Sequence, residues 1–513
     1  MLREHIGSEL VRPLLRSVLA AALAIGLLAL HGCMVGPNYH PQNTPMPTEW
    51  YGSATGPASL PTSQAVQAAR AEVYGGAVTP ATQPTSQPSF TPAQLARWWE
   101  VFNDPTLSSL IERAVKSNLD LQLAQSRLVQ ARAARWVAIS GLGPTVGLNS
   151  AYSRGQASGL SPVRNLYQLN FDATWELDVF GGIRRGVEAA TADVDSAREA
   201  RNGTLVTLVS EVALNYVNLR SFQVRLIIAR DNLKTERHSA DLTRQRYQGG
   251  LVGTLDVANA DAQVAATASG IPLLEAGARQ TIYNISVLLG QEPAALVEEL
   301  APLADIPVGP PQVPVGLPSE LLRRRPDIRQ AEANIHGATA RIGVAEADLF
   351  PHFTMSASLG FTGLQLNHWL TSMGRDWGFG PGVTWPLFES GRRLANIQIQ
   401  KALQEQTILT YRQVVLIALQ EVENVLVAAE SEQQRRVALI EAVAANQKAL
   451  KLSTQLYAQG QTDFLNVLQA QRGLYATQDA LVLSNAAIST DLISLYKALG
   501  GGWEVPEQKA KKH

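Results

Sequence analysis

The side chains best suited to carry chemistry are few in this sequence of 513 residues. It holds a single cysteine, Cys33, and eight histidines scattered along the chain. It contains no His-Glu-x-x-His zinc motif, no paired cysteines, no phosphate-binding loop of the Walker type and no Gly-x-Ser-x-Gly nucleophile motif. We therefore expect neither catalysis nor a bound metal or cofactor, and the one thiol needs a different explanation.

Cys33 directly follows a segment typical of a secretory signal peptide. Basic residues precede an apolar stretch over residues 18–30. This stretch is too short to span a bilayer, because a transmembrane helix needs about 20 apolar residues. The run Leu30-His31-Gly32-Cys33 is similar to the lipobox of bacterial lipoproteins, although His31 stands where a small residue is usual. The similarity implies that residues 1–32 are removed and that Cys33 carries a diacylglycerol and an N-palmitoyl group. The alternative is a chance thiol beside the signal peptide.

The charge is nearly balanced, with 43 lysines and arginines against 44 aspartates and glutamates. Proteins that bind nucleic acids usually have a clear basic excess, so no nucleic-acid partner is expected. The run Arg323-Arg324-Arg325 suggests a site for nucleic acid or lipid headgroups, but Pro326 beside it favours a structural role at the start of a helix.

Most of the chain consists of two copies of one unit. Similar motifs recur about 207 to 210 residues apart. Asp120 corresponds in this way to Asp327, and Tyr247 to Tyr457. The predicted organisation is a leader over residues 33–97, a first copy over 98–292, a proline-rich linker over 293–318, a second copy over 319–505 and a charged tail over 506–513. Because the leader is rich in Pro, Thr, Ser and Gln, we expect an extended tether there.

Each copy predicts the same order of elements. A helical segment comes first, then two short strands, a very long helix, a turn with glycine, and a returning helix. The corresponding ranges are 105–140 and 319–349 for the first helices, 184–248 and 392–458 for the long ones, and 254–290 and 462–499 for the returning ones. Each long helix would extend about 100 Å, at 1.5 Å per residue. Pro272 is expected to kink the first returning helix.

The strand segments alternate strictly between apolar and polar residues. Residues 167–178 place apolar side chains at odd positions, residues 353–361 and 377–387 repeat the rule, and residues 146–152 follow it less clearly. Such a pattern fits strands that cross a membrane, and it fits an ordinary half-buried sheet equally well. The lipoprotein signal favours the membrane. Four strands are too few to close a barrel, and an open sheet edge in lipid is very costly, so this interpretation predicts an oligomer.

In these features the chain resembles the outer-membrane efflux factor family of the TolC and OprM kind, in its lipoprotein branch with the NodT-type channels. The motifs that carry the resemblance are Val35-Gly36-Pro37-Asn38-Tyr39, Trp98-Trp99, Arg323 to Ile328, Tyr457 to Leu465 and Leu495 to Trp503. The resemblance implies a mainly α fold with a membrane β-barrel. In that fold a homotrimer forms a 12-stranded barrel that continues into a 12-helix periplasmic α-barrel.

The resemblance also implies a place and a role. The protein would be anchored by lipid in the outer membrane and would extend into the periplasm. There it would dock a periplasmic adaptor (membrane fusion) protein and an inner-membrane RND-type pump. It would export small molecules passively, such as drugs, metals or solvents. The alternatives are a protein-secretion duct of the same fold and a periplasmic scaffold or adhesin that conducts nothing.

The turns between the long and the returning helices are the candidate gate. The resemblance places Asp463 at the family's aperture aspartate, where three copies would concentrate negative charge. The alternative is that Asp463 caps a helix. Asp256, at the position that corresponds to Asn466, is a candidate for a second ring. Three further candidates, which could instead be solvated or packed helix ends, would hold the tip closed: Arg246, Tyr247 and Tyr457.

Overall fold

The computed structural model describes residues 34–42, 44–48, 50–51, 95–156, 162–309, 318–367 and 370–503. The predicted signal peptide and Cys33 lie outside the described residues, as do residues 52–94 of the leader, residues 310–317 of the linker and the charged tail. The chain divides into two compact units. One comprises residues 1–43, 126–198 and 330–412, and the other comprises residues 44–125, 199–329 and 413–513.

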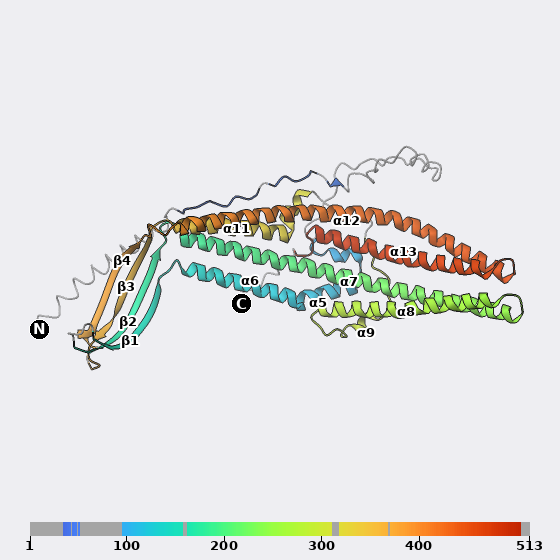
Figure 1. Ribbon diagram of the computed structural model, residues 1–513, viewed down its shortest axis with the longest axis horizontal. Helices are drawn as coiled ribbons and strands as arrows, with labels where there is room; N and C mark the ends of the chain where they lie inside the picture. Colours follow the sequence, from blue (N-terminus) through green and yellow to red (C-terminus); the bar gives the residue numbers. More distant parts are fainter. Residues whose placement is uncertain are drawn as a thin grey trace. The chain divides into compact units, whose positions relative to one another are not determined.

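Helices dominate the structure, and both copies of the repeat show the same order of elements (Figure 1). The first copy contains η1 (Trp98–Phe102), α5 (Pro105–Ser117), α6 (Leu119–Ser140), β1 (Thr145–Gly155), β2 (Arg164–Leu177), α7 (Gly182–Gln248) and α8 (Thr254–Leu288). The short helix α9 (Val297–Leu300) follows. The second copy contains η2 (Pro318–Glu320), α10 (Leu321–Arg324), α11 (Pro326–Ala347), β3 (His352–Gly363), η3 (Ser372–Gly374), β4 (Arg375–Thr384), α12 (Arg392–Ala458) and α13 (Phe464–Ala498).

The first helical segment of each copy is broken, which differs from the continuous helices predicted from the sequence. Asn118 ends α5 with an extended backbone, and its side-chain oxygen accepts a hydrogen bond from the Leu121 N–H at 2.9 Å. In the second copy Arg325 is extended because it precedes Pro326, which disfavours the helical conformation of the residue before it. Pro272 lies inside α8, and the helix continues through it.

The first unit holds a four-stranded antiparallel sheet in the order β1-β2-β3-β4 (Figure 1). The register aligns apolar side chains across all four strands, with Leu148 opposite Phe171, Phe171 opposite Leu359, and Leu359 opposite Trp377. Their exposed fractions are 59%, 54%, 58% and 73%. A sheet that packs one face on a protein core would bury such a row. Here the apolar face is exposed.

The opposite face of the sheet is polar. Asp172 lies opposite Ser358, which lies opposite Gly378. The Asn149 side chain donates a hydrogen bond to the Asp172 carboxylate at 2.5 Å. The Ser356 hydroxyl donates to a carbonyl of β4 at 3.2 Å. This face therefore presents amide, carboxylate and hydroxyl groups to water.

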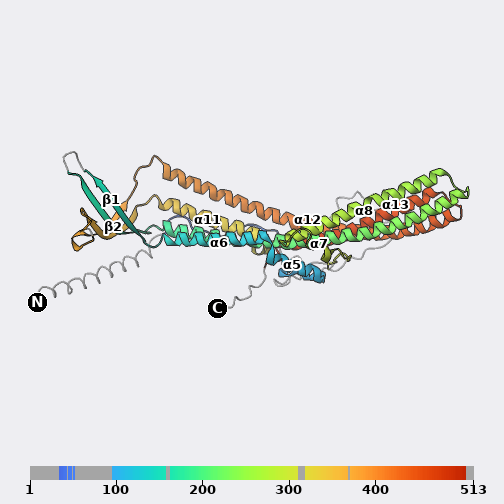
Figure 2. The same cartoon turned by 90° about the horizontal axis from the view of Figure 1, so that it is seen from below.

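The second unit contains α8 and α13 together with the parts of α7 and α12 that pair with them, and the turns of the two hairpins, α7–α8 and α12–α13, lie at the same end (Figures 1 and 2). Its core surrounds Trp98, which is fully buried and stacks on Tyr496 at a centroid distance of 5.2 Å. Asp104 caps α5 by accepting from the Leu107 N–H at 3.0 Å, and it also accepts from the Tyr216 hydroxyl at 2.7 Å. None of the helices in the described parts of the chain is long and apolar enough to span a bilayer.

Arg325 of the basic run has the structural role that was predicted for the run. Arg325 is 7% exposed, and it forms ion pairs at 2.7 Å with Asp327 and with Glu421. It also donates to the Ala498 carbonyl at 3.0 Å. Arg325 thus joins the start of α11 to α12 and to the end of α13.

Candidate functional site at the hairpin ends

The two turns that join the hairpins have the same local design. We call residues 246–256 and 456–466 the hairpin tip. Each long helix is followed, two residues after its end, by a glycine with a positive φ angle, +70° at Gly250 and +76° at Gly460. Glycine adopts this conformation without a steric penalty. The N–H groups of Gly250 and Gly460 donate to the carbonyls of Tyr247 and Tyr457, and the next N–H donates one residue further back. These paired bonds form a Schellman motif, which explains why both copies turn at the same place.

A small apolar cluster supports the tip. Tyr457 is 2% exposed and packs with Phe464 at a centroid distance of 5.4 Å. The other buried members are Ala240, Ala260, Val467 and Leu468. The Tyr457 hydroxyl donates to the Thr243 hydroxyl at 3.2 Å, so it has a polar partner inside the cluster. Since these residues come from α7, α8, α12 and α13, the cluster packs the two hairpins together.

Arg246 links one hairpin to the other by polar contacts. Its guanidinium comes from the last turn of α7 and donates to the main-chain carbonyls of Tyr457 and Ala458 at the end of α12. It also lies over the Tyr457 ring, 4.6 Å from the centroid. A cation is favourable at a helix C-terminus, where unpaired carbonyls carry partial negative charge. Arg246 therefore caps α12 from a neighbouring helix.

The acidic candidates lie at the outside of the tip. Asp463 occupies the N-cap position of α13 and is exposed, but its side chain makes no capping hydrogen bond. Asp463 therefore stands at the N-cap position but does not make the side-chain hydrogen bond that an N-cap residue usually makes. Asp256 is half-buried in the first turn of α8. Asn466 is exposed, and its amide donates to the Thr462 hydroxyl at 2.7 Å.

The structure therefore brings some of the predicted residues together and leaves others apart. Arg246 and Tyr457 are in direct contact. Tyr247 is 46% exposed, and its hydroxyl lies 3.5 Å from that of Thr254 in its own hairpin. Asp463 and Asn466 share one turn, whereas Asp256 belongs to the other.

A buried polar network, which was not predicted from the sequence, lies behind the tip. Glu236 of α7 is 3% exposed and accepts from the Gln263 amide of α8 at 2.9 Å. Gln263 in turn accepts from Arg472 of α13 at 2.7 Å. Burial raises the pKa of Glu236, and hydrogen bonds from Gln263 and Thr267 partly offset that effect. Polar residues at the spacing of Glu236 and Thr243 also occur on helix faces that contact solvent. Only the packing of the helices shows that these two side chains are buried.

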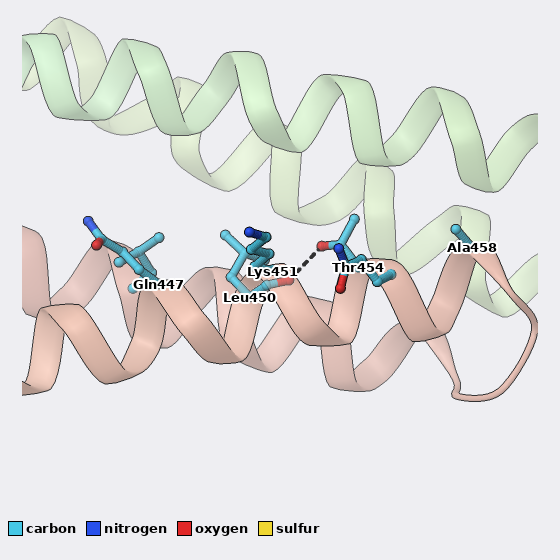
Figure 3. Close-up of a pocket in the computed structure, with 7 residues that line it drawn as sticks. Gln447, Leu450, Lys451, Thr454 and Ala458 are labelled. Carbon is cyan, nitrogen blue, oxygen red and sulfur yellow. Dashed lines mark hydrogen bonds between the residues drawn. The ribbon is translucent and has the colours of Figure 1, made fainter.

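A groove lies beside the tip on the α12–α13 hairpin (Figure 3). Its volume is about 450 Å³. The lining residues are Gln447, Leu450, Lys451, Thr454, Gln455, Ala458 and Leu474. The Thr454 hydroxyl donates to the Leu450 carbonyl at 2.8 Å, within α12. The lining is mainly apolar and amide in character, with one ammonium group from Lys451 and one hydroxyl from Thr454.

Comparisons with known proteins agree on one protein family. A family profile described as "outer membrane efflux protein" matches residues 110–291 and again residues 317–501, which confirms the tandem repeat. Nodulation protein T of Rhizobium leguminosarum biovar trifolii is 32% identical over 94% of this chain and 97% of its own length. The "probable outer membrane lipoprotein SilC" of Salmonella typhimurium is 30% identical over 81% of this chain and 91% of its own.

A solved structure agrees with these relatives. The outer-membrane channel OprN superimposes with a TM-score of 0.82 at 34% sequence identity, over 92% of this chain and all of that one. The similarity spans both copies of the repeat and confirms the expected resemblance to TolC-like channels.

Proposed function

The chain belongs to the outer membrane efflux protein family, and on that premise we propose that it is the outer-membrane channel of a tripartite efflux system. In this role it exports small molecules passively and is not an enzyme. The observation that carries the proposal is the exposed apolar row across the sheet, from Leu148 to Trp377. Water disfavours such a row, whereas the hydrocarbon of a membrane accommodates it.

The two edges of the sheet support an oligomeric barrel. β1 and β4 are the outer strands of the four, so each presents unpaired backbone groups that lipid cannot satisfy. Copies of the chain that pair β4 with β1 of the next would close the wall. A homotrimer would give a barrel of about 12 strands, a number that closed barrels in outer membranes commonly reach.

The polar face of the sheet would then line the passage. Asn149, Asp172 and Ser356 are typical of a lumen filled with water. The helices of the three copies would continue the passage as a periplasmic α-barrel. The relatives support the same role, since one is named for the outer membrane and OprN is described as a channel.

The hairpin tip is the proposed gate. Arg246 and Tyr457 would hold the α7–α8 hairpin against the α12–α13 hairpin in the closed state. Exposed Asp463 from three copies would form a negative ring that favours cations, with Asp256 and Asn466 adding a second ring. Tyr247 would contribute at the surface of the tip.

The partners follow from the family. We propose that a periplasmic adaptor and an inner-membrane pump of the RND type supply the energy and select the cargo. We further propose that Cys33 carries a diacylglycerol and an N-palmitoyl group and anchors the leader in the outer membrane. SilC, which is called a lipoprotein, supports this anchor.

Planar-bilayer recordings test the channel. The purified oligomer should show small conductance steps that grow when Arg246 is replaced by Ala, because the link between the hairpins is lost. A confirmed oligomer that conducts nothing, with or without that substitution, would instead support a scaffold or adhesin. If the channel instead releases a protein from cells and does not export small molecules, the protein-secretion duct would be supported.

A further inference from the structure

The motif Val35-Gly36-Pro37-Asn38-Tyr39 has no part in the proposed gate, yet the first unit holds it firmly. The Val35 N–H donates to the Phe180 carbonyl at 3.1 Å, just after β2. Met34 lies against Gly181, where an added Cβ would approach the Met34 Cγ to 2.5 Å. The segment therefore begins in close contact with the junction between β2 and α7.

Arg185 of α7 binds the main chain of this segment. Its side chain is 1% exposed. The guanidinium donates to the Val35 carbonyl at 3.1 Å, to the Gly36 carbonyl at 3.2 Å and to the Asn38 side-chain oxygen at 2.8 Å. Its remaining partner is Glu188, at 2.8 Å. A buried guanidinium that lost three of its four acceptors would be strongly destabilised, so this site requires a ligand rich in carbonyl groups.

Two glycines allow the close approach. Gly36 has a φ angle of +91°, and an added Cβ would lie 2.4 Å from the Gly343 Cα of α11. A Cβ on Gly343 would lie 2.9 Å from the Arg185 side chain. The Gly343 Cα is a backbone atom and cannot move aside, and the Arg185 side chain is held in place by its hydrogen bonds. The shape of the site thus selects glycine on both sides.

Tyr39 closes the contact at the other end. Its ring stacks on His336 of α11 at a centroid distance of 4.5 Å, and its hydroxyl donates to Glu332 at 2.9 Å. His336 also contacts Glu188 at 3.0 Å. Glu188 therefore joins the Arg185 end of the site to the Tyr39 end. We call Arg185, Glu188, Glu332, His336 and Gly343 the leader site.

We propose that the leader site is a peptide-binding site for the chain's own segment 35–39, and that this binding fixes the lipid anchor at the junction between β2 and α7. The second half rests on the proposed lipid at Cys33. Consecutive Cα atoms lie about 3.8 Å apart, so the peptide bond to Met34 keeps the modified residue at this junction once the segment is bound.

Chymotrypsin cleavage of the full-length protein in detergent tests the binding. Cleavage after Tyr39 is measured by mass spectrometry relative to cleavage after Tyr51, an internal reference that is 72% exposed. Loss of the charged hydrogen bonds in Arg185→Gln should raise this ratio by at least about tenfold. Gly36→Ala changes only the leader, so it should raise the ratio without a risk to the folded body. Arg198→Gln, on the same helix in an exposed ion pair, is the matched control and should leave the ratio unchanged.

An unchanged ratio in both Arg185→Gln and Gly36→Ala would overturn the proposal. Cys33→Ser separates the site from the lipid, because it removes the lipid and leaves the bound segment 35–39 unchanged in sequence. Its ratio should match that of the unaltered protein, and a tenfold rise would show that the lipid alone holds the segment. Palmitate labelling of the same samples reports on the lipid independently, so a failure of lipidation is distinguishable from a failure of the leader site.

Discussion

The guanidinium of Arg246 lies 4.6 Å from the centroid of the Tyr457 ring and donates to the Tyr457 main-chain carbonyl. Arg246 lies in the last turn of α7 and Tyr457 in the last turn of α12, so this contact joins the two hairpins at their tip. Both the cation–π contact and the hydrogen bonds disappear if the tip opens between the hairpins. The contact is therefore the place where substitutions should change the gate.

Arg246→Ala should make the closed state less stable by about 1.5–3 kcal/mol, the usual worth of hydrogen bonds to a charged group. Mean conductance in planar bilayers should rise several-fold. The matched control is Arg244→Ala, since Arg244 forms exposed ion pairs with Asp241 and Asp261 in its own hairpin. Equal conductance in the two variants would argue against a gating role for Arg246.

Tyr457 should tolerate the loss of its hydroxyl better than the loss of its ring. Tyr457→Phe removes one hydrogen bond to Thr243, worth about 1 kcal/mol. Tyr457→Ala leaves a cavity in the cluster around Phe464 and should cost about 3–5 kcal/mol. Thermal unfolding followed by circular dichroism should give the highest melting temperature for the unaltered protein, a lower one for the Phe variant and the lowest for the Ala variant. A Phe variant as unstable as the Ala variant would contradict this account of the cluster.

Asp463→Asn should change selectivity and leave stability intact. The exposed carboxylate makes no capping bond, so the unfolding free energy should stay within about 0.5 kcal/mol, as for ordinary surface substitutions. The preference for cations, measured as the reversal potential in a KCl gradient, should weaken. Asp241→Asn removes an exposed charge from the side of α7 and is the control. A loss of stability without a change in reversal potential would favour the capping role.

Glu236 should make stability depend on pH. Because burial raises its pKa in the folded protein, the folded state binds the proton more tightly than the unfolded chain. The stability that protonation provides is complete below the ordinary pKa and is lost as the pH rises through the raised value. Glu236→Gln keeps an oxygen for the Gln263 amide and carries no charge. Its melting temperature should exceed that of the unaltered protein at pH 8, and the difference should shrink towards pH 4. A constant difference over this range would refute the assignment.

Cys33→Ser should abolish incorporation of labelled palmitate into the mature protein. The chain has no other cysteine, so no second thiol can accept the lipid. A variant that still takes up the label would refute the modification at Cys33.

The sequence alone predicted the features that depend on local periodicity. Alternation with period two is visible in residues 167–178, because successive side chains of a strand point to opposite faces. The positions of both turns could be read from Gly250 and Gly460, since only glycine adopts a positive φ angle at no cost. The repeat and the family followed from motifs in a fixed order.

Only the tertiary structure showed which side chains meet. Arg246 and Tyr457 are 211 positions apart, and Arg185 and Val35 are 150 apart. No local pattern encodes such pairs, because each contact depends on how separate helices pack. The same holds for Glu236, whose burial comes from α8 and α13 rather than from its own neighbours in sequence. Periodicity thus determines the elements, whereas the packing of distant segments determines the contacts at the tip and at the leader site.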